Sequence, residues 1–140
     1  MNRSILAVAL TTALLVSGCG PLKYTLQSTD KAPGADATLF ADIHADQGNT
    51  RVDFTATNLA PPDRIETGDT AFVAWWRKDD KALWQRIGAL QYSPEKRYGS
   101  LEAGSVPETA FDFQVSGEKA VDAASPSPSI IFAQHVAPKK

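Results

Sequence analysis

Apolar and polar residues alternate with a period of two along most of the chain beyond residue 36. This pattern is typical of strands that bury one face of a sheet and expose the other. The alternation is clearest in two runs, residues 37–46 and 51–57, which flank the turn residues Gln47-Gly48-Asn49. Two such runs around a short turn that contains glycine predict a β-hairpin.

Further segments have strand character and are separated by proline, glycine or charged turns. They comprise residues 70–77, 82–92, 97–102, 111–115 and 129–136. Pro61 and Pro62 precede the first of them and break the sheet, because proline cannot donate to a ladder. The pattern contains no amphipathic helix, so the chain is predicted to be all-β, a single immunoglobulin-like antiparallel β-sandwich of about 6–8 strands.

The segment 19–36 is polar and rich in turn residues. Within it, only residues 23–27 alternate like a strand, with Tyr24 and Leu26 on one face. This composition fits either a flexible tether or a first edge strand. We predict a tether over this segment and the β-sandwich domain over 37–137.

A polar turn at Lys78–Lys81 separates two of the strongest strand segments. A simple hairpin closed by this turn would place two pairs on the core face, Trp76 opposite Leu83 and Phe72 opposite Ile87. This face is the more apolar of the two, so we expect it to face the core.

The opposite face of this hairpin would carry Trp75, Trp84 and Arg86. An exposed aromatic pair beside a cation is a candidate patch for a sugar, a peptide or another protein. Large aromatic side chains more often pack, however, so a loop or strand that covers them is the favoured alternative. A one-residue bulge near Gly88 would also exchange the faces of part of the strand.

The first eighteen residues have the organisation of a secretory leader. Residues 1–3 include the positive charge of Arg3, and residues 4–16 carry no charge at all. An apolar run of this length is too short to span a bilayer, which takes ~20 residues. We therefore predict a cleaved signal peptide over 1–18, which would leave 122 of the 140 residues.

The leader ends in Val16-Ser17-Gly18-Cys19, which resembles the lipobox of bacterial lipoproteins. The resemblance implies a diacylglyceryl group on the Cys19 sulfur, cleavage between Gly18 and Cys19, and often acylation of the new amino group. Cys19 is the only cysteine of the chain. Because stable membrane attachment takes two or more acyl chains, this modification would anchor the protein in the bacterial cell envelope. Gly20 after the cysteine, in place of aspartate, slightly favours the periplasmic face of the outer membrane.

The net charge of the chain argues against a nucleic-acid partner. All sixteen acidic residues follow the predicted cleavage site, while Arg3 precedes it, so the mature chain has thirteen basic residues and a formal net charge of −3. No basic stripe is present that would attract phosphate backbones, so we expect no nucleic-acid partner.

The segment from Phe72 to Val136 resembles the extracytoplasmic β-sandwich of the anti-sigma-K factor family. The resemblance lies in the runs VAWWR, IGAL and FDFQVSGEK, followed by a Pro-Ser stretch before the last strand. It implies a sandwich fold and a sensor or regulator role. The family's cytoplasmic sigma-binding part and membrane-spanning helix have no counterpart in this sequence.

Motifs of catalysis are missing: there is no Gly-x-Ser-x-Gly elbow, no His-Glu-x-x-His and no phosphate-binding glycine loop. Asp42, His44 and Asp46 would share a strand face, but its ends lie ~13 Å apart, too far for one ion to bind all three. His135 has no evident partner in the sequence. We predict no catalytic residue, no metal and no other cofactor.

These observations favour a lipid-anchored, non-enzymatic interaction module, held on the membrane through Cys19, with an envelope protein or a glycan as its partner. Two alternatives stay open, a module that binds a small ligand or glycan through exposed tryptophan, and an extracytoplasmic sensor or regulator. An outward tryptophan pair in a groove would favour ligand binding, and a flat apolar patch would favour a protein partner.

Overall fold

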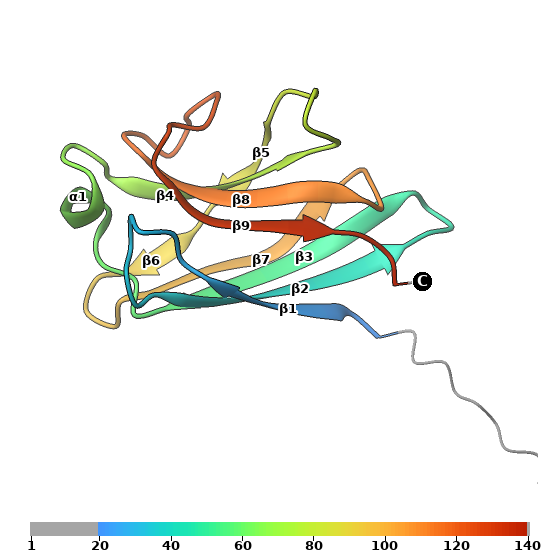
Figure 1. Cartoon of the computed structure of the whole chain (residues 1–140), viewed down its shortest axis with the longest axis horizontal. Coiled ribbons are helices and arrows are strands. Elements are labelled where there is room, and N and C mark those ends of the chain that lie inside the picture. Colours follow the sequence, from blue (N-terminus) through green and yellow to red (C-terminus); the bar gives the residue numbers. More distant parts are fainter. Residues whose placement is uncertain (1–19, 140) are drawn as a thin grey trace, which may run out of the picture.

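The computed structural model describes residues 20–139, and these residues form two antiparallel β-sheets packed face to face (Figure 1). Within this range the elements are β1 (Leu22–Gln27), β2 (Asp36–His44), β3 (Asn49–Thr57), α1 (Pro62–Ile65), β4 (Ala71–Arg77), β5 (Gln85–Ala89), β6 (Gln91–Ser93), β7 (Tyr98–Val106), β8 (Phe111–Glu118) and β9 (Ile130–Val136). The predicted all-β sandwich is confirmed, with nine strands in the described part of the chain rather than six to eight.

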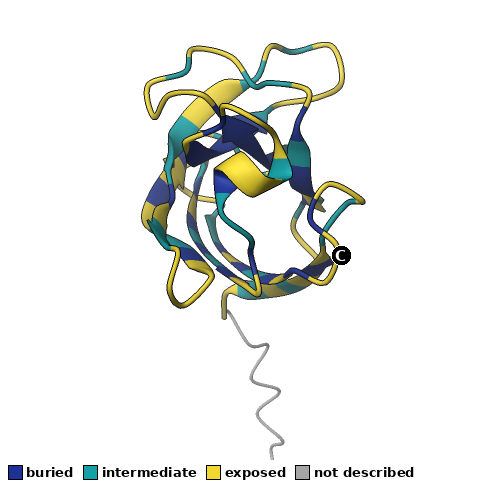
Figure 2. Cartoon of the chain, turned by 90° about the vertical axis from the view of Figure 1, so that its left-hand side faces the viewer, coloured by how far each residue is buried: buried dark blue, intermediate teal, exposed yellow. Residues whose placement is uncertain are grey.

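One sheet has the strand order β1-β2-β3-β7-β6, and the other has the order β5-β4-β8-β9. The first three strands form a meander within one sheet, whereas an immunoglobulin domain places its second and third strands in opposite sheets. The buried apolar residues of the two sheets form one hydrophobic core. Figure 2 marks their positions along the strands in dark blue. At the centre of the core the rings of Phe113 and Phe132 lie 5.5 and 5.6 Å from that of Phe54.

The predicted hairpin at residues 37–57 is confirmed by the pairing of β2 with β3. Leu39 lies opposite Phe54, and Ala41 lies opposite Val52, with all four side chains fully buried. Because a strand has a period of two, these residues all point to the core, and the residues between them point outward. Gly48 takes a φ of 69° in the turn, a conformation that glycine adopts without strain.

The predicted tether over 19–36 is wrong from Leu22 onward, because β1 is an edge strand of the five-stranded sheet. Tyr24 pairs with Leu39, and the buried Leu26 pairs with Ala37. The following loop is also fixed, since the Thr29 amide donates to the Ile131 carbonyl at 2.9 Å. The sandwich therefore begins at Leu22 rather than at residue 37. Five or six residues with two apolar positions are too short a pattern to distinguish a strand from a tether without its partner.

The predicted register of the β4–β5 hairpin is also wrong. Trp76 lies opposite Gln85 rather than Leu83, and Leu83 is 87% exposed in a wide loop at 78–84. The pairing shifts by one residue after Ala74, so the anticipated bulge beside Gly88 is present. This irregularity leaves Ile87 partly buried against the core although it does not face Phe72.

The segment 82–92, predicted as one strand, is divided between the two sheets. β5 pairs with β4, whereas β6 pairs with β7 in the opposite sheet. Leu90 lies at the crossing, with its side chain buried and its amide donating to the Phe72 carbonyl at 2.8 Å. A continuous apolar run does not show where a chain leaves one sheet for the other, because both sheets share the same core.

The bulged strand β7 packs tightly against its neighbours. The β3–β7 register shifts next to Asp53, and Ala103 on the opposite strand takes a positive φ of 54°. The Asp53 carboxylate accepts a hydrogen bond from the Ala103 amide at 2.9 Å. A Cβ atom added to Gly104 would lie 2.8 Å from Ile87 Cγ2 and 2.9 Å from Val52 Cγ2, so this position has room for glycine only.

The two ends of the sandwich differ in what they contain (Figure 1). β1 begins and β9 ends at one end, which we call the entry end; it also holds the turn at 45–48 and the loop at 78–84. The opposite end, which we call the far end, holds α1, the loop at 28–35 and the β8–β9 connection; it faces the viewer in Figure 2.

Candidate functional site

Of the three residues of the predicted tryptophan patch, the structure separates Trp84 from the other two, and Trp75 pairs with Arg86 instead. Trp75 lies opposite Arg86 on the outer face of the four-stranded sheet, yet its side chain is 0% exposed. Its indole nitrogen donates a 2.8 Å hydrogen bond to the hydroxyl of Ser116. Trp75 is therefore a packed residue, as the alternative of a covering loop had anticipated.

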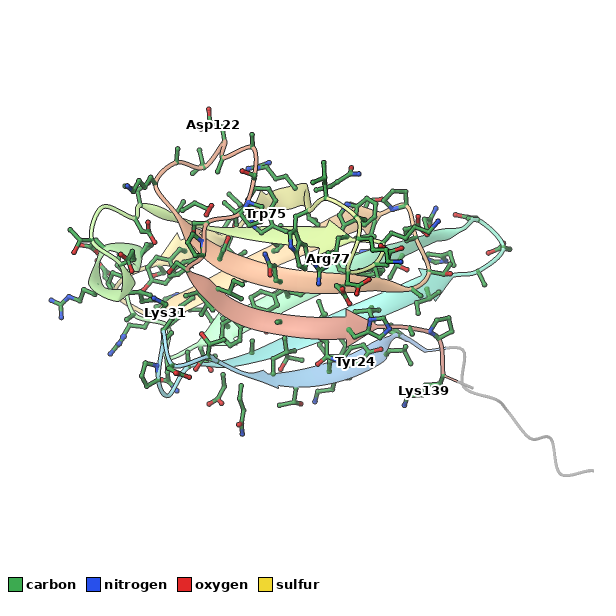
Figure 3. All side chains as sticks on the ribbon, turned by 45° about the horizontal axis from the view of Figure 1, so that its top comes forward. Tyr24, Lys31, Trp75, Arg77, Asp122 and Lys139 are labelled. Carbon is green, nitrogen blue, oxygen red and sulfur yellow. The ribbon has the colours of Figure 1, made fainter. Side chains whose placement is uncertain are left out.

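The covering element is the connection between β8 and β9, residues 119–128, which we call the cover loop. Figure 3 shows this loop, with Asp122 at its tip, above Trp75. The loop reaches from β8 across β4 to β5, where Arg86 donates two hydrogen bonds to the Val121 carbonyl at 2.6 and 3.2 Å. Arg86 thus fixes the loop and is not a free cation beside an aromatic pair.

The base of the cover loop is fixed by Glu118, which is 3% exposed. Both carboxylate oxygens of Glu118 accept the amide hydrogen of Ser127, at 2.7 and 3.0 Å. The Ser127 hydroxyl in turn donates to the Gly117 carbonyl at 2.6 Å. These contacts give the buried Glu118 carboxylate hydrogen-bond partners and hold the cover loop against β8.

Trp84 lies in a separate shallow groove at the entry end. We call it the Trp84 groove, and it has a volume of ≈ 330 Å³. Its polar side chains are Arg77, Trp84, Asp112, Gln114, Gln134 and His135. The Arg77 guanidinium carbon lies 4.5 Å from the centre of the Trp84 ring, the geometry of a cation–π contact. Trp84 is only partly exposed in this position.

Three neighbouring strands supply the charged row of this groove. Arg77 of β4 is opposite Asp112 of β8, which is opposite His135 of β9. The Asp112 carboxylate accepts a hydrogen bond from Arg77 Nε at 3.0 Å, and its other oxygen lies 2.9 Å from His135 Nδ1. Partial burial acts to raise the pKa of Asp112, but the hydrogen bonds and charges of His135 and Arg77 outweigh it and hold the pKa below its ordinary value.

The sequence does not predict this charged row. Arg77 and Asp112 belong to no motif, and His135 has no evident partner in the sequence. Their juxtaposition depends on the pairing of β4 with β8 and of β8 with β9, which joins segments far apart in the chain. A match of opposite charges at strand ends is the one signal that could have suggested it.

The structure does not bring Asp42, His44 and Asp46 together on one strand face, because β2 ends at His44. Asp42 Oδ2 lies 3.4 Å from His44 Nε2, and both side chains are about two-fifths exposed. Asp46 lies beyond the strand, in the turn. Among residues 20–139, no group of three or more histidine, cysteine or acidic side chains is arranged to hold a metal ion.

The predicted signal peptide, the cleavage residue Gly18 and the lipidation residue Cys19 lie outside the described residues. In the described part, no helix is long and apolar enough to cross a membrane. No protein-family model, curated protein or solved structure matches the chain. The resemblances to lipoproteins and to the anti-sigma-K family therefore stay predictions.

Proposed function

We propose that this protein is a lipid-anchored, non-enzymatic module of the bacterial cell envelope. The entry end of its β-sandwich would face the membrane surface. The observation that carries the proposal is the position of β1. Only Gly20 and Pro21 separate Cys19 from Leu22, the first residue of the sheet. Three extended residues span at most ~10 Å, so lipid on Cys19 would hold this end of the sandwich at the bilayer surface.

The C-terminal tail supports the same orientation. The Tyr24 hydroxyl lies 3.4 Å from both the carbonyl oxygen and the amide nitrogen of Ala137, so the tail leaves the sandwich beside β1 (Figure 3). The tail carries Lys139 and Lys140, whose charges would be attracted to anionic lipid headgroups. The far end would then face away from the membrane, toward its partners.

The contacts of the two histidines support a role without catalysis. Their ring nitrogens contact the carboxylates of Asp112 and Asp42. Among residues 20–139, no serine or threonine hydroxyl hydrogen-bonds to a histidine ring, as an activated nucleophile would.

Lipid attachment is tested by growing cells with an alkyne-labelled fatty acid and comparing the wild type with Cys19→Ser. We expect label in the membrane fraction for the wild type, and neither label nor membrane retention for the variant. Retention of an unlabelled variant in membranes would contradict the proposal.

Orientation is tested with two single-cysteine variants, Asp46→Cys at the entry end and Asp122→Cys at the far end. The lipidated Cys19 sulfur cannot react, so each introduced cysteine is the one reactive thiol of the chain. With nitroxide labels and a nickel chelator carried by the lipids of a vesicle, we expect stronger relaxation at position 46 than at position 122. Equal or reversed relaxation would contradict an end-on arrangement.

A second candidate function is the binding of a sugar or similar small ligand in the Trp84 groove. It is favoured by a partly exposed aromatic ring beside the donors Arg77 and Gln134. Trp84→Ala should abolish binding to soluble peptidoglycan fragments, whereas Leu83→Ala, a neighbouring exposed change outside the groove, should not. Equal binding by both variants would exclude this groove as the site.

A further inference from the structure

A second, larger pocket lies at the far end, between α1, the cover loop and the loop at 28–35. It has a volume of ≈ 620 Å³, within the range of small-molecule sites. Its charged and polar lining includes Lys31, Glu66, Asp69, Glu118, Lys119 and Ser129. Lys31 marks its position beside α1 in Figure 3. We call this hollow the far-end pocket.

Two buried oxygens in this pocket have no hydrogen-bond partner among the described residues, Asp69 Oδ2 and Ser129 Oγ. Asp69 is 4% exposed and Ser129 is 5% exposed. Buried acceptors of this kind are rare in folded proteins, because an unpaired polar atom costs free energy that a hydrogen bond would recover. A ligand that donates hydrogen bonds would satisfy both.

Both oxygens lie beside the backbone of Gly117. A Cβ atom built on Gly117 would lie 2.6 Å from Asp69 Oδ2 and 3.5 Å from Ser129 Oγ. The backbone on either side is fixed, since Gly117 N donates to the Ser129 carbonyl at 2.9 Å and Thr70 N donates to the Glu118 carbonyl at 2.8 Å. Glycine at this position leaves room for the Asp69 carboxylate, with which any side chain would collide.

The other charged groups that face the pocket already have contacts or lie on its rim. Both oxygens of Glu118 accept the Ser127 amide, and Glu66 lies 3.9 Å from the exposed Lys31 ammonium. Burial, and then the negative charge of Glu66, raise the pKa of the Asp69 carboxyl, while Lys119 lowers it, and the net change is upward. A cation placed beside Asp69 would oppose this rise, because a nearby positive charge favours the ionised carboxylate.

We propose that the far-end pocket binds a small ligand through a protonated amine, which donates hydrogen bonds to Asp69 Oδ2 and Ser129 Oγ. An ammonium group carries three N–H donors and a positive charge. Hydrogen bonds between such a group and a carboxylate are roughly twice as strong as neutral ones. The inference concerns the described domain alone and does not depend on lipid at Cys19.

Other ligand classes fit the pocket less well. A hard metal ion such as Ca²⁺ needs six to eight oxygen ligands, and two unpaired oxygens do not supply them. An anionic ligand would meet three carboxylates, those of Glu66, Asp69 and Glu118, against the two lysines Lys31 and Lys119. A purely apolar ligand would leave Asp69 Oδ2 and Ser129 Oγ without partners.

The test compares three probes of equal chain length that differ in charge: 1,5-diaminopentane, 1,5-pentanediol and glutarate. Binding to the full chain in detergent micelles is measured by isothermal titration calorimetry near neutral pH. We expect saturable binding of the diamine, binding of the diol weaker by about tenfold or more, and no binding of glutarate. Absence of diamine binding, or binding of the diol or glutarate as tight as that of the diamine, would overturn the proposal.

Variants locate the site. Asp69→Asn keeps the shape but removes the charge and should weaken diamine binding by about tenfold or more, and Ser129→Ala should weaken it to a smaller extent. Asp46→Asn, an exposed change at the opposite end, is the matched control and should bind like the wild type. Unchanged affinity of Asp69→Asn would refute the assignment.

A second readout needs no variant at position 69. The carboxyl carbon of Asp69 in the wild-type chain can be titrated by NMR with and without the diamine, and its pKa should fall when the diamine binds. An Asp69 pKa that does not respond to a bound diamine would also refute the assignment. Repeating the calorimetry with Cys19→Ser separates this proposal from lipid anchoring, since the two can then fail independently.

Discussion

Replacing each of two tryptophans with alanine tests whether the outer face of the four-stranded sheet is packed or open. Trp75 is 0% exposed and donates a hydrogen bond to Ser116, so Trp75→Ala removes a whole buried ring and leaves a cavity under the cover loop. Buried Trp→Ala changes cost about 3–5 kcal/mol. Trp84 is partly exposed and stacks on Arg77, a contact worth about 0.5–1 kcal/mol near a surface. We expect Trp84→Ala to cost about 1 kcal/mol in total, at least ~2 kcal/mol less than Trp75→Ala.

The assay is equilibrium unfolding in urea, followed by far-ultraviolet circular dichroism, which does not depend on tryptophan fluorescence. A loss of stability shifts the unfolding midpoint, and an unchanged slope shows that the unfolded states of the variants are comparable. Trp75→Phe and Ser116→Ala, alone and together, then isolate the indole hydrogen bond, with a coupling of about 1 kcal/mol. Equal losses for the two alanine variants, or a larger loss for Trp84→Ala, would refute the packing argument.

Further predictions concern single positions. The lowered pKa of Asp112 means that its ionised form stabilises the fold above the ordinary Asp pKa of ~3.9, and that this stability is lost as the pH falls through the lower pKa of the folded state. The stability difference between wild type and Asp112→Asn should therefore shrink as the pH falls below about 4; a difference that grows as the pH falls below this value would contradict this. Gly104→Ala places a methyl group against Ile87 and Val52 and should lower stability by about 1–3 kcal/mol in thermal unfolding, while no loss would mean that the strand can shift. Ala103→Gly relieves a positive φ of 54° and should raise stability or leave it unchanged, within about 1 kcal/mol, whereas a clear loss would contradict strain there.

The fold class could be predicted from the sequence because a half-buried strand shows a local alternation of apolar and polar residues. The β2–β3 hairpin is the best case, since alternation and turn residues coincide at Gly48 and the pairing that they predict is the one observed. The register of β4 and β5 did not follow, because the polar residues 78–81 suggested a turn shorter than the loop at 78–84. Loop length sets register, and a shift of two residues moved Leu83 from the predicted core into solvent.

The candidate site was harder to predict because its parts come from separate segments. Trp75 has the alternation of an exposed residue, and what buries it is a loop of small residues and prolines with no pattern of its own. Asp69 belongs to no motif either. Its unpaired Oδ2 atom fits into the structure only because Gly117, on the distant strand β8, has no side chain. Such features arise from three-dimensional packing, which a period-two pattern does not encode.

The position of β1 has a mechanical consequence. With lipid on Cys19, a pull on the far end would be transmitted to the membrane along the axis of β1, which pairs with β2 through the six residues Leu22–Gln27. Antiparallel ladder bonds run perpendicular to the strands, so a force along the axis loads all of them together as shear and does not open them one by one. An anchor attached at the opposite end of the same strand would peel it away from the sheet. If Cys19 carries lipid, the short link to Leu22 would therefore make β1 the strand through which the sandwich resists such a pull.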